Sequence, residues 1–355
     1  MVDVTVDDPT ADWTAPGVYQ AAPQVYRIPL PLPQDGLRAV NVYAIVAGEE
    51  LVLIDAGWAI AQAREQLERG LGALGAGLGD VDRFLITHAH QDHYTQAVVL
   101  RREFGSAIAL GKGEQPQLDL INNSSADARP AFEDRLIKSG ATGLLERLRA
   151  FGRHQPDPTV WEYPDSWLSD RDVVEVGERQ LAAIATPGHT RGHVVFLEDA
   201  TKLLFAGDHV LPHITPSIGF EGAGVDFPLR DYLESLRLVR GLPDTVLLPA
   251  HGPTGGSTHR RIDELLEHHD RRLEVIYDAV ERGASSAAEA AGMITWTRRE
   301  RKLDELGLFN EMLAVLETLS HLDVLVLQGR LGVSVVEGTR RYELAGGGGS
   351  ASVAG

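Results

Sequence analysis

The sequence predicts an α/β protein in which helices cover the faces of β-sheets. Two observations lead to this prediction. Short apolar runs with strand composition recur up to about residue 250, and amphipathic stretches with helical spacing lie between them. With 355 residues, the chain is long enough to bury a large core and to form one large domain or two.

The expected elements follow one another closely. Glu49-Glu50 supplies a polar turn between the second and third strands. Apolar residues spaced as on one face of a helix run from Ile60 to Leu71, and glycines close that segment. The expected strands are 24–30, 39–46, 51–55, 83–87, 107–110, 173–176, 180–185, 194–197, 203–206 and 245–248, and the expected helices in this region are 60–74, 94–104 and 229–242.

Composition restricts the classes of function. Hydrophobic residues make up 43% and charged residues 24% of the chain, as in ordinary globular proteins. The net charge of -18 argues against binding to a phosphate backbone, because that activity requires a basic surface. The absence of cysteine excludes disulfides, thiolate zinc sites and cysteine nucleophiles. The acidic N-terminus has no signal-peptide pattern and no apolar run reaches membrane-spanning length, so we expect a cytoplasmic protein.

The stretch Thr87-His88-Ala89-His90-Gln91-Asp92-His93 is the main candidate for chemistry. Neutral imidazole is the commonest metal ligand near neutral pH, and this cluster follows an expected strand. On an extended strand His88 and His90 point to the same side, and a turn beyond them would direct Asp92 and His93 elsewhere. The spacing predicts two adjacent metals that each take a pair of ligands. The alternative, a solvated polar turn with incidental histidines, does not account for this spacing.

Four further motifs lie in order along the chain. They place Asp55 in Leu53-Ile54-Asp55-Ala56-Gly57, His189 in Thr186-Pro187-Gly188-His189-Thr190, Asp208 in Ala206-Gly207-Asp208 and His251 in Pro249-Ala250-His251-Gly252-Pro253. Together with the complete H-x-H-x-D-H pattern, they resemble the metallo-beta-lactamase superfamily over roughly residues 24–345. The resemblance implies a four-layer αβ/βα sandwich with metals at the sheet edges. One departure is Tyr94-Thr95-Gln96, which stands where many members have glycine and concerns the shape of the adjacent pocket.

The resemblance also implies a ligand set. It assigns one metal to His88, His90 and His189, the other metal to Asp92, His93 and His251, a bridging role to Asp208, and to Asp55 the orientation of a ligand histidine. Two such metals would hold a bridging water and lower its pKa from about 15.7 towards 7, which supplies hydroxide at neutral pH. Asp92 and Asp208 are the expected catalytic carboxylates. Zinc is the expected metal, and iron and manganese are the alternatives.

Three classes of function remain open at this point. The first is a hydrolase of a small acyl substrate, meaning a thioester, an ester or a lactone, which suits the acidic composition. The second is a phosphodiesterase or ribonuclease of the same superfamily, which would require a basic track leading to the metals. The third is a non-catalytic binding protein on this fold, and the complete ligand set argues against it. Resemblance of fold does not name the substrate.

The chain is expected to divide into four regions. Residues 1–22 lack periodicity and are expected to form a flexible arm, 23–257 the catalytic domain, and 346–355 a flexible glycine-rich tail. Residues 258–345 combine helices with a hairpin turned at Glu337-Gly338, and they resemble the winged-helix tail of one branch of the superfamily. Because acidic residues outnumber basic ones, we expect packing or homodimerisation there, with a small-molecule substrate and neither nucleic acid nor membrane as a partner.

Residues 113–165 form an expected helical insert in the catalytic domain. Its apolar residues either form a lid over the metals or pack into a core of the insert itself, and the sequence leaves both interpretations open. These residues are Phe132, Leu136, Leu144, Phe151 and Trp161. Among the remaining histidines, His209 and His213 are expected to be structural and His321 to pack within the C-terminal region. His268 and His269 are expected to be solvated, and His154 lies in a polar loop.

Overall fold

The computed structural model describes residues 3–33, 36–123, 131–151, 157–221, 226–297 and 299–346. The chain divides into two compact units. The first combines Met1–Ala126, Pro156–Pro216 and Tyr232–Leu265, and the second combines Asp127–Gln155, Ser217–Asp231 and Leu266–Gly355. In the described part of the chain, no helix is both long enough and apolar enough to cross a membrane.

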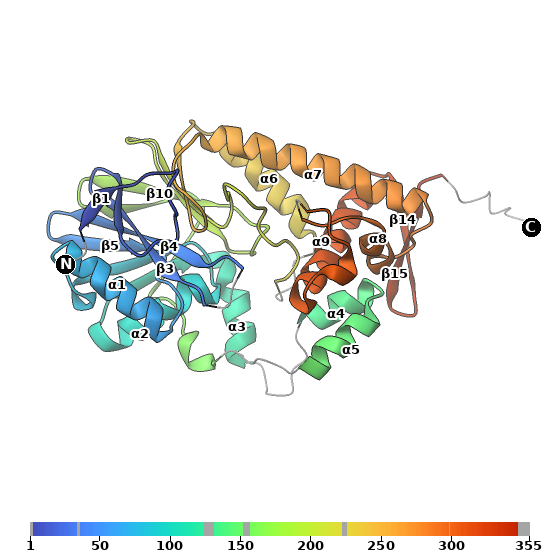
Figure 1. Ribbon diagram of the computed structural model, residues 1–355, viewed down its shortest axis with the longest axis horizontal. Helices are drawn as coiled ribbons and strands as arrows, with labels where there is room; N and C mark the ends of the chain where they lie inside the picture. The colour runs from blue at the N-terminus through green and yellow to red at the C-terminus, as the bar shows by residue number, and fades with distance from the viewer. Residues whose placement is uncertain are drawn as a thin grey trace, which may run out of the picture. The chain divides into compact units, whose positions relative to one another are not determined.

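The first unit contains two β-sheets (Figure 1). In the larger sheet each strand pairs with the next strand of the chain. The pairs from β2 to β5 are antiparallel, and those from β5 to β8 are parallel. Parallel neighbours require a crossover, which helices supply between β5, β6 and β7. The strands are β1 (Val4–Val6), β2 (Val18–Ala22), β3 (Val25–Pro31), β4 (Ala39–Ala47), β5 (Glu50–Ile54), β6 (Arg83–Ile86), β7 (Ala107–Gly111) and β8 (Ser166–Leu168).

The smaller sheet packs face to face with the larger one. Its strand order is β13-β12-β11-β10-β9, and only the β12–β13 pair is parallel. The core between the sheets includes Tyr43 and Ile54 from the larger sheet and Phe196 and Phe205 from the smaller one. The rings of Tyr43 and Phe205 meet edge to face with centroids 5.5 Å apart. The strands are β9 (Asp172–Val176), β10 (Arg179–Ala185), β11 (Val194–Glu198), β12 (Leu203–Gly207) and β13 (Val246–Pro249).

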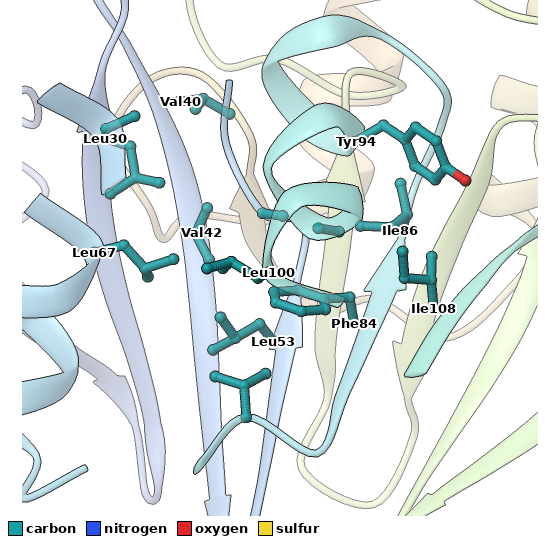
Figure 2. Close-up of a cluster of buried hydrophobic side chains, with 14 of the residues drawn as sticks. Leu30, Val40, Val42, Leu53, Leu67, Phe84, Ile86, Tyr94, Leu100 and Ile108 are labelled. Carbon is teal, nitrogen blue, oxygen red and sulfur yellow. The ribbon is translucent and has the colours of Figure 1, made fainter. Parts of the chain in front are cut away.

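Helices α1 (Ala61–Ala73) and α2 (Gln91–Phe104) cover the outer face of the larger sheet. Figure 2 shows Leu67 of α1 and Leu100 of α2 directed at Val42, Leu53 and Phe84 of the sheet. Each of these side chains is fully buried, and complete burial of one such apolar side chain contributes about 1.5–3 kcal/mol. The predicted α/β class, with helices over packed sheets, is therefore confirmed. The remaining elements of the first unit are α3 (Gln115–Asn123), η1 (Leu78–Asp80), η2 (Lys112–Glu114) and η3 (Pro158–Val160). The boundaries between the two units fall within α6 (Pro228–Arg240) and α7 (Thr258–Glu281).

The N-terminal segment differs from the flexible arm that the sequence suggests, because it contributes β1 and β2 to the larger sheet. The buried guanidinium of Arg27 explains the difference. Its Nε and Nη2 atoms donate to the two carboxylate oxygens of Asp7 at 2.8 and 2.6 Å, and Nη1 donates to the carbonyl of Trp13 at 2.7 Å. A buried charge requires partners of this kind. No periodic pattern in the first 22 residues reveals them.

The second unit is built from helices and a two-stranded hairpin. Its central helix is α9 (Leu308–Leu327), which is buried along most of its length and packs against α8 (Ala287–Met293) and η4 (Leu303–Glu305). β14 (Leu331–Val336) and β15 (Thr339–Leu344) form an antiparallel pair, with positive φ angles at Glu337 and Gly338 in the turn. The predicted hairpin and its turn are confirmed, and a winged helix remains an expectation.

Two helices of the predicted insert, α4 (Ala131–Lys138) and α5 (Thr142–Phe151), belong to the second unit, whereas α3 belongs to the first. Helices α4 and α5 pack against each other and against α9. Leu136 and Leu144 are buried there, whereas Phe151 is 85% exposed. Trp161 instead joins the core of the first unit, beside Tyr94. The apolar residues of the insert are therefore divided between two cores, which neither sequence interpretation anticipated.

Candidate metal centre

The seven histidine and aspartate residues of the predicted site come together in the first unit, where strands end. Strand ends are rigid, so ligands from separate segments can meet there with fixed geometry. One difference from the sequence interpretation is local, because α2 begins at Gln91 and not at Tyr94. The seven residues are His88 and His90 after β6, Asp92 and His93 in the first turn of α2, His189 after β10, Asp208 after β12, and His251 after β13.

Three histidines and one carboxylate oxygen form the first group of potential ligand atoms. His90 Nδ1 lies 3.0 Å from His88 Nε2 and 3.1 Å from His189 Nε2. His189 Nε2 lies 3.4 Å from Asp208 Oδ2. The four residues offer ligand atoms that all lie within 4.8 Å of one another, which is close enough for a single ion to reach them.

The second group uses the other oxygen of the same aspartate. His251 Nε2 lies 3.4 Å from Asp92 Oδ2 and 3.3 Å from Asp208 Oδ1. His93 Nε2 lies 3.5 Å from Asp92 Oδ2 and 3.7 Å from Asp208 Oδ1. Asp208 therefore directs one oxygen at each group, which is the position that a bridging carboxylate requires.

Asp55 and Thr87 orient two of these histidines. Asp55 accepts hydrogen bonds from the Thr87 N–H group at 2.8 Å, from Thr87 Oγ1 at 3.0 Å and from His93 Nδ1 at 2.8 Å. Because the Thr87 hydroxyl donates to Asp55, it accepts from His88 Nδ1, which lies 3.0 Å away. This network places a proton on Nδ1 of each imidazole and directs its Nε2 atom at the ligand group.

A backbone carbonyl and a further histidine orient the rest of the site. His251 Nδ1 donates to the carbonyl of Ala39, 2.7 Å away on the first residue of β4. His193 Nε2 accepts a hydrogen bond of 3.1 Å from the backbone N–H of Asp208. The Nδ1 atom of His193 must then carry the proton, and it donates to Thr186 Oγ1 at 2.9 Å.

Sequence reasoning missed His193. Its ring stacks on that of His88, with centroids 5.0 Å apart and an interplanar angle of 29°. The available signal was its position four residues after His189, since a second histidine so close to a ligand-type residue is unusual. His209 is fully buried against Tyr232, in agreement with the structural role expected for it. The expectation of a solvated His269 is wrong, because its side chain is buried and its ring stacks on that of His321. Tyr94, the departure from the family pattern, is fully buried in the core shown in Figure 2.

The electrostatic environments of the two groups differ. Burial, reinforced by the neighbouring His93, holds the pKa of His88 well below its usual value, and burial together with His189 lowers the pKa of His90 to about 3. Burial also acts to lower the pKa of His93, but Asp92 and other carboxylates outweigh it and raise the pKa to about 10. His88 and His90 are thus neutral imidazoles, and the second group is an electronegative site that attracts a positive counter-charge.

The residues fit a pair of divalent metals. Nε2 of His93, Nε2 of His251 and Oδ1 of Asp208 are buried and lack a well-aligned hydrogen-bond partner among the described residues. Leaving a buried polar atom unpaired costs about 1–3 kcal/mol, so such atoms in a native protein call for a ligand. Imidazole and carboxylate donors without sulfur suit zinc, iron or manganese. A histidine–aspartate cluster of this kind on this fold implies divalent metals.

A hollow of about 460 Å³ adjoins the loop that carries His189. Its lining includes two basic side chains, Lys112 and Arg191, and two acidic ones, Asp119 and Asp170. The formal charges of these four groups cancel. The volume falls in the range of small-molecule sites.

Comparisons with known proteins agree with the fold. A model of the Metallo-beta-lactamase superfamily matches residues 35–251. "Probable metallo-hydrolase YqjP" of Bacillus subtilis is 25% identical over 311 residues, which cover 84% of this chain and 90% of that protein. "Atrochrysone carboxyl ACP thioesterase" of Aspergillus fumigatus is 26% identical over 285 residues, covering 79% and 73%. "Lactamase-like protein nscB" of Neosartorya fischeri is 26% identical over 240 residues, and the matched part spans only 56% of that protein.

Two crystal structures resemble the whole chain. A beta-lactamase domain protein from Burkholderia ambifaria has a TM-score of 0.77 and 27% identity, covering 96% of this chain and 97% of that one. A metallo-beta-lactamase family protein from Thermus thermophilus has a TM-score of 0.75 and 27% identity, covering 91% and 99%. These matches confirm the predicted fold class, and the family model spans more than half of the chain. The chain therefore belongs to the metallo-beta-lactamase superfamily and is an enzyme of that fold.

Proposed function

We propose that this protein is a metal-dependent hydrolase of a small acyl substrate, namely a thioester, an ester or a lactone. The observation that carries the proposal is the pair of buried ligand groups that share Asp208, because two metals held on one carboxylate suit hydrolysis of such bonds. The net charge of -18 favours an acyl substrate over a polyanion. The relative named as a thioesterase supports the same choice.

The ligand set proposed for the metals follows the two groups. His88, His90 and His189 would hold one metal, Asp92, His93 and His251 the other, and Asp208 both. We propose zinc, with iron and manganese as alternatives. When bound, such metals lower the pKa of a water molecule and polarise the acyl oxygen.

The protein's own carboxylates would orient the attacking water. Asp92 Oδ2 and Asp208 Oδ1 lie 3.4 and 3.3 Å from His251 Nε2, so the two carboxylates face the same point. For both groups burial acts to raise the pKa, but neighbouring histidines outweigh it and lower the pKa below its ordinary value. Both side chains therefore remain charged hydrogen-bond acceptors at neutral pH, which is the state needed to hold a water molecule in one orientation.

The second candidate is a phosphodiesterase or ribonuclease of the same superfamily. Such an enzyme would need a basic approach to the metals, because each phosphate of the substrate carries a negative charge. The hollow beside the loop of His189 instead combines two basic with two acidic side chains. None of the seven ligand-type residues lines this hollow, so the preference for an acyl substrate rests on the net charge of -18.

One comparison of substrates tests the proposal. A single zinc-loaded preparation is assayed against acyl-thioesters, aryl esters and lactones, and in parallel against a structured RNA and a simple phosphodiester, with Asp208→Ala as the control. We expect hydrolysis of at least one acyl class that stops on chelation and is lost in the control. Cleavage of RNA without acyl hydrolysis would reverse the ranking. Activity on neither set, despite bound metal, would favour a non-catalytic binding protein.

Two proposals concern the rest of the chain. We propose that residues 258–345 form a winged-helix-like region that serves packing or homodimerisation, since helices precede the β14–β15 hairpin there. We also propose that the protein acts in the cytoplasm and binds neither nucleic acid nor membranes. Light scattering at several protein concentrations measures the oligomeric state and therefore tests homodimerisation.

A further inference from the structure

Glu114 is a buried carboxyl group beside the loops of the first ligand group, and the predicted site gave it no role. It is the last residue of η2, which follows β7 directly in the first unit, and its side chain is fully buried. Burial raises the pKa of this carboxyl to about 7, although the Thr190 hydroxyl and the N–H groups of Ala89 and Gly192 oppose the shift. Burying such a group costs free energy, so its position requires an explanation.

One face of Glu114 is fixed to the loop that carries His189. The hydroxyl of Thr190, the next residue after His189, donates a hydrogen bond to Glu114 Oε1. Gly192 packs directly on the same residue, because a Cβ atom built on Gly192 would lie 2.0 Å from the backbone nitrogen of Glu114 and 2.6 Å from its Cγ. Only glycine allows this approach, so the loop and Glu114 are in close steric contact as well as hydrogen bonded.

The carboxyl group of Glu114 also interacts with the loop after β6. Glu114 Oε2 lacks a well-aligned hydrogen bond among the described residues, yet the N–H group of Ala89 interacts with the carboxyl and favours its charged form. Ala89 lies between His88 and His90 in the chain. One carboxyl group therefore contacts both of the loops that supply the three histidines of the first group.

We propose that Glu114 is a positioning residue that fixes the loop of His88 and His90 relative to the loop of His189, and so determines the metal affinity of the first group. This inference rests on the proposed function, in which that group holds a metal. The second group is oriented by different atoms, because Asp55 holds His93 and the carbonyl of Ala39 holds His251. A change at Glu114 should consequently weaken one metal and spare the other.

The test measures metal binding and not turnover. Metal-free wild-type protein, Glu114→Gln and Thr190→Val are titrated with Zn²⁺ in competition with a chelator of known affinity. The first variant keeps the size of the side chain and loses its charge, and the second removes one hydroxyl at nearly constant volume. We expect two equivalents in the wild type, and in each variant one equivalent bound about 10- to 100-fold more weakly with the other unchanged, as found when groups that orient ligands are removed. Titration with Co²⁺ should show an altered absorption spectrum for the affected equivalent alone.

Glu198→Gln is the matched control. Glu198 is also almost fully buried in the first unit, where it pairs with Arg179 at 2.7 Å, so the same chemical change is made away from the ligand loops. A merely structural role for Glu114 predicts that both glutamine variants melt at lower temperature and bind both metals as the wild type does, and that result would overturn the inference. Equal weakening of both equivalents would overturn it as well. Should Glu114→Gln not fold, Thr190→Val decides alone. Wild-type protein that binds no metal would refute the proposed function itself.

Discussion

Replacement of Asp7 by alanine should destabilise the first unit strongly, although this residue lies in a segment that looks dispensable in the sequence. Its carboxylate forms a bidentate ion pair with Arg27, and the two side chains are only 4% and 2% exposed. Removing one partner of a buried ion pair leaves an uncompensated charge and costs about 3–5 kcal/mol. Thr254 Oγ1 also donates to Asp7 at 2.6 Å, so the substitution removes a third hydrogen bond.

The assay is urea denaturation of metal-free Asp7→Ala beside Asp12→Ala. Asp12 is the matched control, because its ion pair with Arg38 is longer, at 3.5 Å, and both side chains are more than half exposed. With a slope of about 1–3 kcal/mol per molar urea, the expected loss moves the midpoint by at least about 1 M in Asp7→Ala, and we expect little change in the control. Asp7→Ala combined with Arg27→Met should recover much of the loss, because no buried charge remains. Indistinguishable midpoints for the two single variants would refute this reasoning.

The remaining predictions concern the metal centre and the insert. Elemental analysis should find about two metals per chain, and a chelator should remove both metal and activity; protein that neither retains nor takes up metal would contradict the ligand set. His90→Ala and Asp208→Ala should each lower turnover by orders of magnitude while circular dichroism stays native, whereas loss of folding in both would indicate a structural metal. If α4 and α5 contact the substrate, exposed Phe151 replaced by serine should raise KM without loss of metal, and unchanged kinetics would show that these helices only pack in the second unit.

The sequence predicted those parts of the site that a local pattern describes. His88 and His90 follow a strand that the sequence pattern predicts, and the motifs around Asp208 and His251 each follow a short apolar run. Each predicted strand therefore supports the prediction that the residues just after it are metal ligands. The N-terminal strands could not be predicted, because Asp7 stabilises them through Arg27, which lies 20 residues further along the chain. Pairing of this kind depends on tertiary contacts and leaves no periodicity in the segment itself.

Apart from Asp55, which its own motif indicated, the residues that orient the ligand-type side chains were equally difficult to predict from the sequence. Glu114 stands in an unremarkable Lys-Gly-Glu sequence, and only the approach of Gly192 and Thr190 in the folded chain shows what its carboxyl contacts. For the insert, the helices could be predicted but the element that they pack against could not. The spacing of apolar residues predicts the amphipathic helices α4 and α5. Amphipathic spacing indicates only that one face of a helix is buried and does not identify the element that covers this face, which here is α9.

The position of His251 illustrates why the motif alone does not make the site. Asn41 Nδ2 and Tyr43 Oη, both on β4 of the larger sheet, donate to the carbonyl of Pro249 at 3.0 and 2.7 Å. The carbonyl of Ala39 on the same strand accepts from the Nδ1 atom of His251. The smaller sheet therefore supplies the ligand-type histidine, while the larger sheet fixes its backbone and its tautomer. Since these contacts come from residues 206 to 212 positions away, the geometry of the second ligand group depends on how the two sheets pack and not on the sequence around His251.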